Sequence, residues 1–559
     1  MKRVERLGEY SRRWAWDDHG SSIGALLTVL AFAVGWWQLG LVLIAVVAAV
    51  MFRSQARVRR WAGRFVAPRL ILVAALIPVL AQGVSPEAGA AITIVGCAVV
   101  AERLLRDPLL RLGARRFLNI PGADPSADGE VASRTAFSVN SIALLLGLAA
   151  AAWALPVLAF AAAVVSVLAT LALGIAIARA RPRRAASLER GFAGLAEARP
   201  VFLLHWDGPA SAAYQLTMWL PYLDRLGLPY AIVVRNRAVV DDLAGVTDAP
   251  VVHCVAEADV ERVVVDSVTT VFYVNTALKN AHLIRYNHLT HIQLNHGDSD
   301  KPASASKAFR MFDVNFVAGR AAIDRFAHYG VHVEPGQAQI VGRPQVEAIE
   351  RADARAEGAP TVLYAPTWGG YFSDSDFCSL PVGAALVQDL LDRGCRVVFR
   401  PHPLTARNPE HGAIVDRIDA MLAAHASAHD VDHAWGVRAT QEWSIVDCMN
   451  ASDAMIADVS STVTDYLFSE KPLAMMSPST SADAFVESYA VAGYTYVLEG
   501  EPASWTAVLD DMFGDDSMRG RRRAGRDYYL GDFSAAAYAD AFVEAARDWL
   551  RRAAEPAAR

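Results

Sequence analysis

Long apolar tracts occupy the first third of the chain. They cover residues 21–52, 66–105 and 136–178. A helix that crosses a bilayer needs about 20 apolar residues, so each tract is too long for one crossing and fits two short ones. Polar or interfacial residues interrupt the first two tracts at WWQLG (36–40) and QGVSPEAG (82–89), and Pro156 marks a weaker break in the third. The pattern predicts a transmembrane region over residues 1–184 with about six spans, near residues 22–36, 38–52, 67–82, 88–104, 138–155 and 157–178.

The distribution of arginine supports paired spans. An arginine cluster follows each apolar tract, and further basic residues precede the first one. Lys and Arg collect on the cytoplasmic side of membrane proteins, and only hairpins place all of these clusters, with both termini, on that side. Buried core helices or a cleaved signal peptide explain tracts of this length and number less well. Because charged residues avoid the deep apolar parts, we expect an anchor or a platform for a lipid substrate rather than a conduit.

The rest of the chain alternates short apolar, β-branched runs with helical stretches. The candidate strands form two sets, at 201–206, 230–236, 270–275, 291–297 and 314–319, and at 361–368, 395–403, 453–461 and 472–477. Continuous apolar strands between helices indicate parallel sheets that are covered on both faces. We therefore predict an α/β fold with two doubly wound, Rossmann-like domains that face each other across a cleft. The expected domains are residues 201–350 and 361–559, with linkers at 185–200 and 351–360.

Charge is divided between the same two parts. Residues 1–190 contain 22 Lys and Arg against 11 Asp and Glu, and the remainder contains 31 against 48, for a net charge of −6. An acidic soluble part argues against nucleic acid as a partner, because a polyanion binds a basic face. The five cysteines are scattered, which favours a reduced compartment and argues against disulfides or a zinc site. We expect no metal and no cofactor, since carboxylate clusters and the GxGxxG, P-loop, GxSxG and HExxH patterns are missing.

Polar residues follow several candidate strands, and ligands of such sheets bind beyond the carboxyl ends of the strands. The first group is NHGDSDK, in which His296 and Gly297 end a strand. Gly297 permits a tight turn and a close approach of ligand, and His296 has an ordinary pKa suited to a general base. Lys301 could neutralise a phosphate. A structural histidine in a polar turn is the alternative, and the neighbouring residues favour a functional site.

Two further strand ends carry candidate binding residues. In YAPTWGG, Thr367 and the backbone amides that follow could hold a phosphate or a ribose, while Trp368 could equally pack between domains. In FRPHP, the two prolines stiffen the loop, so that Arg400 and His402 project from a fixed strand end. A guanidinium offers a planar fork of donors to an anion. The alternative is a surface salt bridge for Arg400 and a loop cap for His402.

The fourth strand end is DVSSTVTDY, where a strand ends at Asp458 and a helix begins. The hydroxyls that open the helix belong to Ser460, Ser461 and Thr462. Together with free N–H groups, such hydroxyls form an anion site. Simple N-capping explains the same residues and does not exclude binding. Asp465, one turn later, could hydrogen-bond a ligand hydroxyl or lie on the helix surface.

The set NHG…DK, YAPTW, FRPHP and SDAMIADVSSTVTDY resembles, in its order and spacing, the CDP-glycerol glycerophosphotransferases of teichoic acid synthesis. The resemblance covers roughly residues 201–542. It implies a GT-B-like fold, in which two Rossmann-like domains enclose the active site in a cleft. It also implies transfer of glycerol phosphate from CDP-glycerol to a hydroxyl on a membrane-attached acceptor.

The resemblance assigns roles to individual residues. His296 matches the catalytic base, and Arg400 and His402 match residues that bind the donor pyrophosphate. The helix start that holds phosphate corresponds to Ser460, Ser461 and Thr462. The family commonly reads HGTPxK and has an Arg after APTW, whereas this chain has Asp298 after the glycine and Gly369 after the tryptophan. We therefore expect Asp298 to mark a changed substrate.

The expected reaction is an in-line displacement at the donor phosphorus. His296 would take the proton of the acceptor hydroxyl. Arg400, His402 and the helix start would stabilise charge on the leaving CMP and on the transferred phosphate, and Lys301 would assist. Two alternatives stay open: transfer of a sugar or of another polyol phosphate, such as ribitol phosphate, and a non-catalytic nucleotide sensor or scaffold. The expected partners are a nucleotide donor, a membrane-attached polyol-phosphate or glycolipid acceptor, and the bilayer, with the catalytic domain in the cytoplasm.

Overall fold

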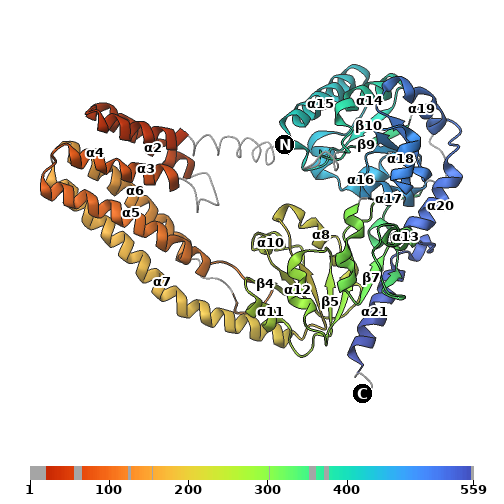
Figure 1. Ribbon diagram of the computed structural model, residues 1–559, viewed down its shortest axis with the longest axis horizontal. Helices are drawn as coiled ribbons and strands as arrows, with labels where there is room; N and C mark the ends of the chain where they lie inside the picture. The colour runs from red at the N-terminus through yellow and green to blue at the C-terminus, as the bar shows by residue number, and fades with distance from the viewer. Residues whose placement is uncertain are drawn as a thin grey trace. The chain divides into compact units, whose positions relative to one another are not determined.

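The chain divides into two compact units, Met1–Gly194 and Leu195–Arg559. The structure is a computed structural model (Figure 1). It describes residues 20–55, 66–123, 128–153, 155–300, 302–351, 360–369 and 377–555. Lys301 lies outside the described residues, so its expected contact with phosphate stays a prediction.

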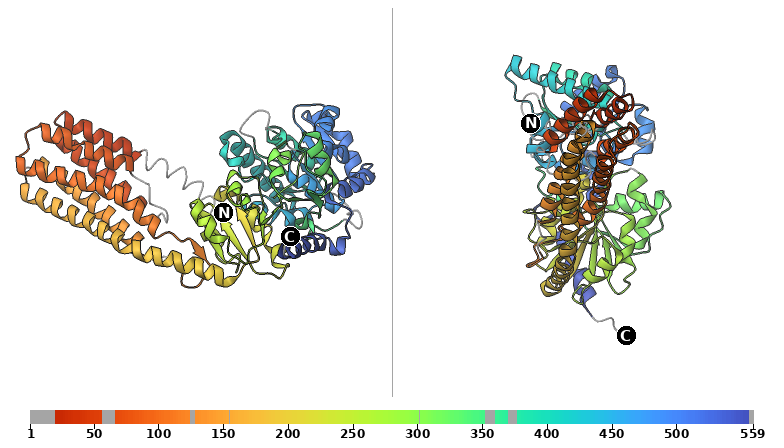
Figure 2. Two further views of the ribbon diagram at one scale, coloured as in Figure 1. Left: turned by 60° about the horizontal axis from the view of Figure 1, so that its bottom comes forward. Right: turned by 90° about the vertical axis from the view of Figure 1, so that its left-hand side faces the viewer.

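The first unit consists mainly of helices that lie side by side (Figures 1 and 2). After a helix at Gly20–Ala33 come α2 (Trp37–Gln55), α3 (Val66–Ala74), α4 (Leu76–Ala81), α5 (Pro86–Leu112), α6 (Asp128–Ala152) and α7 (Pro156–Ala198). In the described residues, three helices are long and apolar enough to cross a membrane: Pro86–Leu112, Val131–Ala151 and Pro156–Ala198. The apolar helices Gly20–Ala33, Trp37–Met51 and Ala67–Ala81 are shorter.

The expected number of six spans is therefore not confirmed. Apolar helices do occupy the six predicted regions, but the first three have only 10–17 residues each. At 1.5 Å per residue, a helix of about 15 residues covers roughly 22 Å of a hydrocarbon core that is about 30 Å thick. The structure supports three candidate spans and leaves the first three helices short of the required length.

Charged residues near the two ends of the second apolar tract are buried inside the helical unit. Glu102 of α5 is fully buried and accepts a hydrogen bond from Arg69 of α3. Nη1 of Arg106 lies 3.6 Å from the same carboxylate, and the Arg69 guanidinium lies 4.3 Å from the ring centroid of Phe137. Pairing offsets the cost of burying these charges. The cluster joins α3, α5 and α6 from segments far apart in sequence.

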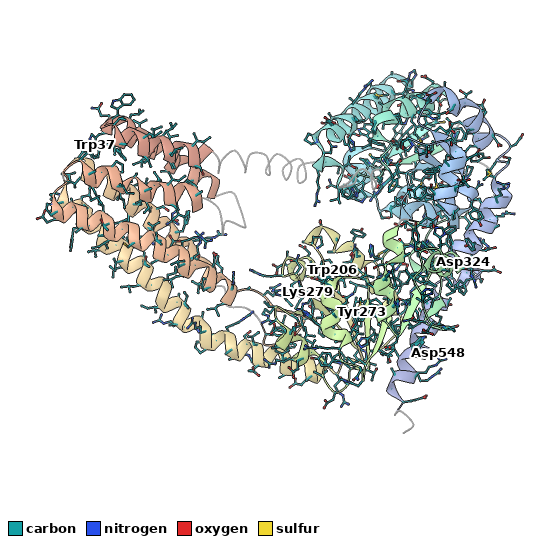
Figure 3. The ribbon with its side chains drawn as sticks, viewed as in Figure 1. Trp37, Trp206, Tyr273, Lys279, Asp324 and Asp548 are labelled. Carbon is teal, nitrogen blue, oxygen red and sulfur yellow. The ribbon has the colours of Figure 1, made fainter. Side chains whose placement is uncertain are left out.

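The second unit begins with a parallel sheet. Its strands are β2 (Phe202–Trp206), β3 (Tyr230–Val234), β4 (Val251–His253), β5 (Thr270–Tyr273), β6 (Thr290–Gln293), β7 (Val314–Val317) and β8 (Ala338–Ile340). They lie in the order β4-β3-β2-β5-β6-β7-β8, and all of these pairs are parallel. Trp206 and Tyr273, labelled in Figure 3, are fully buried side chains of this sheet. The strand order reverses between β2 and β5. The carboxyl ends of these two strands therefore form the switch point, where ligands bind in such sheets.

Helices connect the strands of this first α/β domain. They are α8 (Tyr214–Thr217), α9 (Leu220–Asp224), α10 (Ala238–Asp242), α11 (Glu257–Val263), α12 (Ala281–Ile284) and α13 (Arg320–His328). Residues Thr290–Gln293 form β6 and are almost completely buried. The chain then leaves the sheet as an irregular loop, residues 294–300, which carries His296; this segment is named the His296 loop below.

A second parallel sheet follows. Its strands are β9 (Thr361–Ala365), β10 (Arg396–Phe399), β11 (Ala454–Ala457), β12 (Leu473–Ser477) and β13 (Tyr496–Glu499), in the order β10-β9-β11-β12-β13. The helices are α14 (Leu380–Asp392), α15 (Pro409–His429), α16 (Ile445–Asn450), α17 (Ser461–Tyr466), α18 (Ala482–Ser488), α19 (Trp505–Phe513), α20 (Arg519–Leu530) and α21 (Asp540–Ala554). The predicted α/β class with parallel, Rossmann-like sheets is confirmed. The switch point of this sheet lies between β9 and β11.

The C-terminal helices join the two α/β domains. Tyr528 of α20 donates to Asp324 of α13 over 2.9 Å. On α21, the ring of Phe542 lies 5.2 Å from that of Trp219. Although α21 lies within the predicted range 361–559 of the second domain, its Phe542 side chain packs against Trp219 of the first.

Candidate active site

His296 follows β6 and points its ring at the end of the neighbouring strand. Its Nδ1 lies 3.0 Å from the carbonyl oxygen of Val274. A carbonyl oxygen only accepts hydrogen bonds, so Nδ1 carries the proton and Nε2 of the neutral ring keeps a lone pair. Burial lowers the pKa of His296, the hydrogen bond to Val274 opposes this shift, and the charge of Arg343 adds to it. The ring is therefore neutral at neutral pH and suited to accept a proton at Nε2.

Two contacts hold the start of the His296 loop in place. Nε1 of Trp219 donates to the Asn295 carbonyl over 2.7 Å, and Asn295 has a positive φ of 59°. A Cβ atom at position 297 would lie 3.2 Å from both Cβ and Oγ of Ser461. Glycine allows the loop to lie directly against the start of α17, because any larger residue would push Ser461 away. The structure thus brings His296 and Gly297 together with Ser461, across the two α/β domains.

Arg343 completes this contact and was missed by the sequence analysis. It follows β8 and donates to the Asp465 carboxylate from Nε and from Nη2, the latter over 3.1 Å. Its Nη2 also lies 3.5 Å from the carbonyl oxygen of His296. Asp465, which we expected to hydrogen-bond a ligand, is therefore paired with Arg343. The signal in the sequence is GRP after a strand, similar to FRP in the FRPHP loop. This strand, β8, has only three partly buried residues and therefore lacks the apolar run that identifies a strand.

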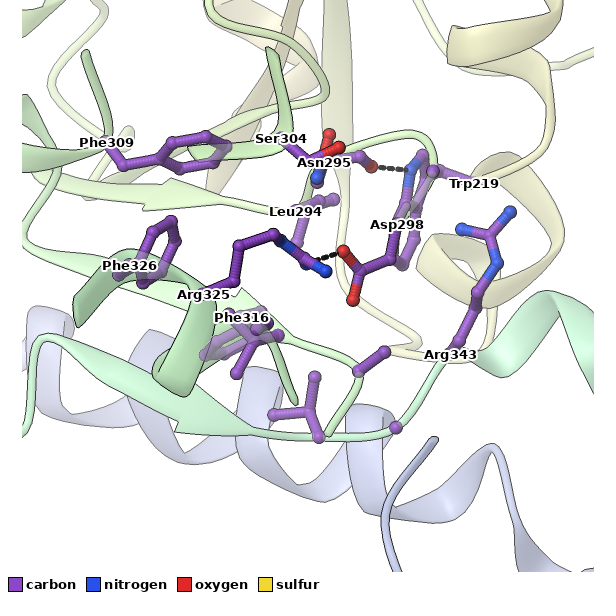
Figure 4. Close-up of a pocket in the computed structure, with 16 residues that line it drawn as sticks. Trp219, Leu294, Asn295, Asp298, Ser304, Phe309, Phe316, Arg325, Phe326 and Arg343 are labelled. Carbon is purple, nitrogen blue, oxygen red and sulfur yellow. Dashed lines mark hydrogen bonds and ion pairs between the residues drawn. The ribbon is translucent and has the colours of Figure 1, made fainter. Parts of the chain in front are cut away.

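Asp298, which we expect to mark a changed substrate, is a buried residue that pairs with an arginine. Its carboxylate accepts from Arg325 of α13, and Figure 4 shows Arg325 directed at it. Nη1 of Arg325 also donates to Asp300 over 3.0 Å. The Asp298 carbonyl accepts from Thr464 Oγ1 over 2.8 Å, which adds a second contact between the His296 loop and α17. All three charged side chains are more than nine-tenths buried.

The switch point of the second sheet is organised by Asp458. Its Oδ2 accepts from the backbone amides of Thr367, over 2.7 Å, and of Ser379, over 3.1 Å. Asp458 is fully buried and Thr367 almost so, so this carboxylate fixes the loop after β9. Oγ of Ser460 and Oγ1 of Thr462 lie 2.6 Å apart. The Ser460 side chain makes no capping hydrogen bond to α17, so capping does not explain this residue.

His402 and Trp368 come together from the ends of β10 and β9. Their rings are stacked with centroids 6.3 Å apart. Nδ1 of His402 accepts from the Leu404 amide over 3.1 Å, so the neutral ring carries its proton on Nε2 and can donate to an anion. Nη1 of Arg400 donates to the carbonyls of Ala439 and, over 2.8 Å, Trp443. Nη1 of Arg400 is therefore used in hydrogen bonds within the second domain.

The site has polar groups that suit an anion. Within the described ranges, no three His, Cys, Asp or Glu side chains lie close enough together to ligate an ion. A cavity of about 30 Å³ lies beside the His296 loop and is lined by Trp219, Gly297, Asp298, Arg325 and Arg343, among others (Figure 4). Such a volume holds about one water molecule.

Comparison with solved structures finds proteins of related architecture. A UDP-N-acetylglucosamine 2-epimerase from Listeria monocytogenes, described as putative, is 10% identical over 63% of this chain and 97% of its own, with a TM-score of 0.44. The wall teichoic acid polymerase TagF is 12% identical over 66% and 95%, with a TM-score of 0.41. A glycosyltransferase from Rickettsia africae ESF-5 is 13% identical over 63% and 99%, with a TM-score of 0.40. No functional assignment follows from likenesses at these scores.

A family model supplies the functional comparison. Among curated proteins the sequence has no significant match. Residues 337–482 match the model of the CDP-glycerol:poly(glycerophosphate) glycerophosphotransferases. This segment contains Arg343, the YAPTW and FRPHP loops, and the start of α17. The predicted resemblance to the CDP-glycerol glycerophosphotransferase family is confirmed for residues 337–482, which contain three of the four strand-end motifs; the His296 motif lies outside the matched segment.

Proposed function

We propose that this chain is a membrane-anchored transferase that moves glycerol phosphate from CDP-glycerol to a hydroxyl of a membrane-attached, teichoic acid-like acceptor. The family match over residues 337–482 supports a transferase of the polyol-phosphate class. The observation that carries the proposal is the tautomer of His296, whose Nδ1 donates to the Val274 carbonyl. Its neutral ring offers a lone pair at Nε2, on a loop that touches the start of α17 in the matched segment.

The chemistry follows from the two histidine rings. Nε2 of His296 takes the proton of the acceptor hydroxyl, and the resulting oxygen forms a bond to the phosphorus of the glycerol phosphate. The bond from this phosphorus to the bridging oxygen breaks, and CMP leaves with the electron pair. Nε2–H of His402 donates to a donor phosphate oxygen and stabilises the negative charge that develops there. Trp368 supports the His402 ring by stacking.

Other groups of the second domain complete the donor site in this proposal. The hydroxyls of Ser460, Ser461 and Thr462 lie beyond β11, at the switch point of the sheet, where ligands of such folds bind. Asp458 serves as a positioning residue, because its carboxylate fixes the Thr367 amide. Arg400 contributes to the donor site through the guanidinium nitrogens other than Nη1. Lys301, outside the described residues, keeps its proposed role in neutralising phosphate.

The helical unit serves as the anchor in this proposal. Three candidate spans would hold the unit in the bilayer, and the three shorter apolar helices would complete paired crossings where the bilayer thins locally, with both termini and the catalytic unit in the cytoplasm. Arginine clusters at the ends of the apolar tracts support this orientation. A multi-pass anchor would keep the active site near acceptors that are attached to the bilayer.

The proposed function is tested with membranes that carry the full chain. They are incubated in parallel with radiolabelled CDP-glycerol, CDP-ribitol and UDP-sugars, and labelled product in the membrane fraction is measured. We expect incorporation from CDP-glycerol and release of CMP, and loss of both in the His296→Asn variant. Preferential incorporation from another donor would overturn the choice of glycerol phosphate in favour of one of the alternative transferases. Nucleotide binding without turnover of any donor would favour the sensor or scaffold.

A further inference from the structure

A buried charged cluster ties the end of the His296 loop to both α/β domains. It consists of Asp298 and Asp300 on the loop, Arg325 on α13 and Tyr529 on α20, and is named the Asp300 cluster. Arg325 donates to both carboxylates. Oδ2 of Asp300 accepts from the Tyr529 hydroxyl over 2.8 Å and from the Val491 amide over 2.8 Å. Tyr529 and Val491 belong to the second domain, so Asp300 links the loop to that domain directly.

The surroundings of this cluster make its hydrogen bonds strong. Asp298, Asp300 and Arg325 are 7 to 8% exposed, and Tyr529 is 1% exposed. The adjoining cavity of about 30 Å³ has room for about one water molecule. Charge-assisted hydrogen bonds in such a dry setting are worth more than in water. A buried network of this kind holds one arrangement of the loop and disfavours others.

The position of the cluster relative to His296 gives it a consequence for catalysis. The His296 loop lies between β6 and the short helix that begins at Pro302, and it contains no regular secondary structure. Its first half is anchored by Val274 and Trp219 of the first domain. Its second half is anchored by the Asp300 cluster, two to four residues beyond His296. Contacts on both sides of the histidine thus define where Nε2 lies.

We propose that the Asp300 cluster positions the His296 base against the donor-binding domain, with Asp300 and Tyr529 as its positioning residues. This inference rests on the proposed function for its catalytic part. Displacement of a catalytic group by about 1 Å lowers a rate about 100-fold. A weakened cluster therefore lowers kcat and leaves the affinity for the nucleotide donor unchanged, because the donor-binding groups lie elsewhere in the second domain.

Two adjacent tyrosines of α20 provide a matched test. Tyr529 donates to Asp300 on the His296 loop, whereas Tyr528 donates over 2.9 Å to Asp324 on α13, away from the loop. Figure 3 shows the position of Asp324. The Tyr529→Phe and Tyr528→Phe variants each remove one hydroxyl and one hydrogen bond from α20 to the first domain, but only the bond of Tyr529 reaches the His296 loop. We expect kcat about tenfold lower for Tyr529→Phe with an unchanged KM for the donor, and near wild-type kinetics for Tyr528→Phe.

Hydrogen exchange gives a second readout that does not depend on activity. We expect faster amide exchange within residues 294–300 in Tyr529→Phe and unchanged exchange there in Tyr528→Phe. Arg325→Lys keeps the charge at the centre of the cluster and should retain more kcat than Arg325→Met, at matched yield of folded protein.

Two results would overturn the positioning role. One is an equal kcat for the two tyrosine variants with equal exchange of the loop. The other is a lower kcat in Tyr529→Phe that is fully explained by a smaller fraction of folded protein, as measured by thermal unfolding. Either result leaves the test of His296 itself intact, since that test uses a different residue. If the wild-type chain transfers nothing, the proposed function fails, and the exchange experiment still decides whether Tyr529 holds the loop.

Discussion

Two histidines follow strands of the two parallel sheets, and hydrogen bonds of opposite sense hold their rings. Nδ1 of His296 donates to the Val274 carbonyl, whereas Nδ1 of His402 accepts from the Leu404 amide. In the neutral rings, Nε2 of His296 is therefore an acceptor and Nε2 of His402 is a donor. The backbone around each ring selects its tautomer and with it the chemistry: one ring can remove a proton, and the other can hold an anion.

The two loops also differ in what supports them. The His296 loop is held by both α/β domains, through Ser461, Thr464 and the Asp300 cluster. The FRPHP loop is held within its own domain, where the Arg400 amide donates to Tyr364 of β9 and the His402 amide to Pro366 just beyond it. The base therefore depends on the relative position of two domains, whereas the anion-holding group does not. Variants that affect one loop and spare the other test this difference.

The largest effect is expected from His296→Asn, which removes the base. General acid–base groups contribute about 10²- to 10⁴-fold, so kcat should fall about 10³-fold while the affinity for CDP-glycerol is unchanged. Turnover of labelled donor and calorimetric titration of the nucleotide measure these two quantities. His332→Asn, at an exposed histidine of the same domain, is the matched control. A His296→Asn enzyme that works at the wild-type rate would remove His296 from the chemistry.

The next largest effect is expected at the Arg343–Asp465 pair, which joins the two α/β domains beside the His296 loop. Arg343→Gln leaves the Asp465 carboxylate without its buried partner, which costs about 3 kcal/mol of stability. Because Arg343 also contacts the His296 carbonyl, kcat should fall with it. The double variant Arg343→Gln, Asp465→Asn should recover much of the stability in thermal unfolding. Equal stability of the single and double variants would show that the pair does not couple the domains.

A smaller and different effect is expected at the other histidine. His402→Phe removes the donor at Nε2 and retains a ring that can stack on Trp368. A hydrogen bond to a charged group contributes about 1.5–3 kcal/mol, so the KM for the donor should rise about tenfold or more. Loss of kcat should be smaller than for His296→Asn. A variant that changes kcat alone would contradict the division of roles between the two rings.

The parts of the fold that the sequence predicted are those with continuous apolar strands. All nine predicted strands correspond to observed ones, at β2, β3, β5, β6, β7, β9, β10, β11 and β12. Within the described residues of the second unit, three strands were missed. β8 and β13 lie at sheet edges and are only partly buried, and β4 has three residues. Short edge strands lack the long apolar run that identifies a buried one.

The candidate site was predictable where local sequence determines geometry, and not where the partner is distant. The approach of Gly297 to Ser461 agrees with two predicted domains that face each other with their strand-end loops. Asp298 and Asp465 are candidate site residues from the sequence, and Asp458 ends a predicted strand. The structure pairs Asp298 with Arg325, Asp458 with the Thr367 amide and Asp465 with Arg343. These partners come from 27 to 122 residues away, and nothing in the local pattern identifies them.

The smallest predicted effect separates the two histidines by pH. Burial lowers the pKa of His296 from its usual value of 6.5, and the charge of Arg343 lowers it further. The neutral base is then present above pH 6.5 and is lost as pH falls through the lowered pKa. The free energy of unfolding should change in the same sense: it is highest above pH 6.5 and falls as the pH drops through the lowered pKa. The acid limb of kcat/KM should therefore lie below pH 6.5.

Arg343→Gln should move this acid limb toward higher pH, because it removes the cation that disfavours protonated His296. The shift should be modest, since burial is the larger cause of the lowered pKa. His402→Phe should leave the limb where it is, because a ring that only donates to the nucleotide does not set the protonation of the base. If the acid limb moved in His402→Phe and stayed fixed in Arg343→Gln, His402 would be the base and His296 would not. The pH profile thus distinguishes the two rings even where both variants retain activity.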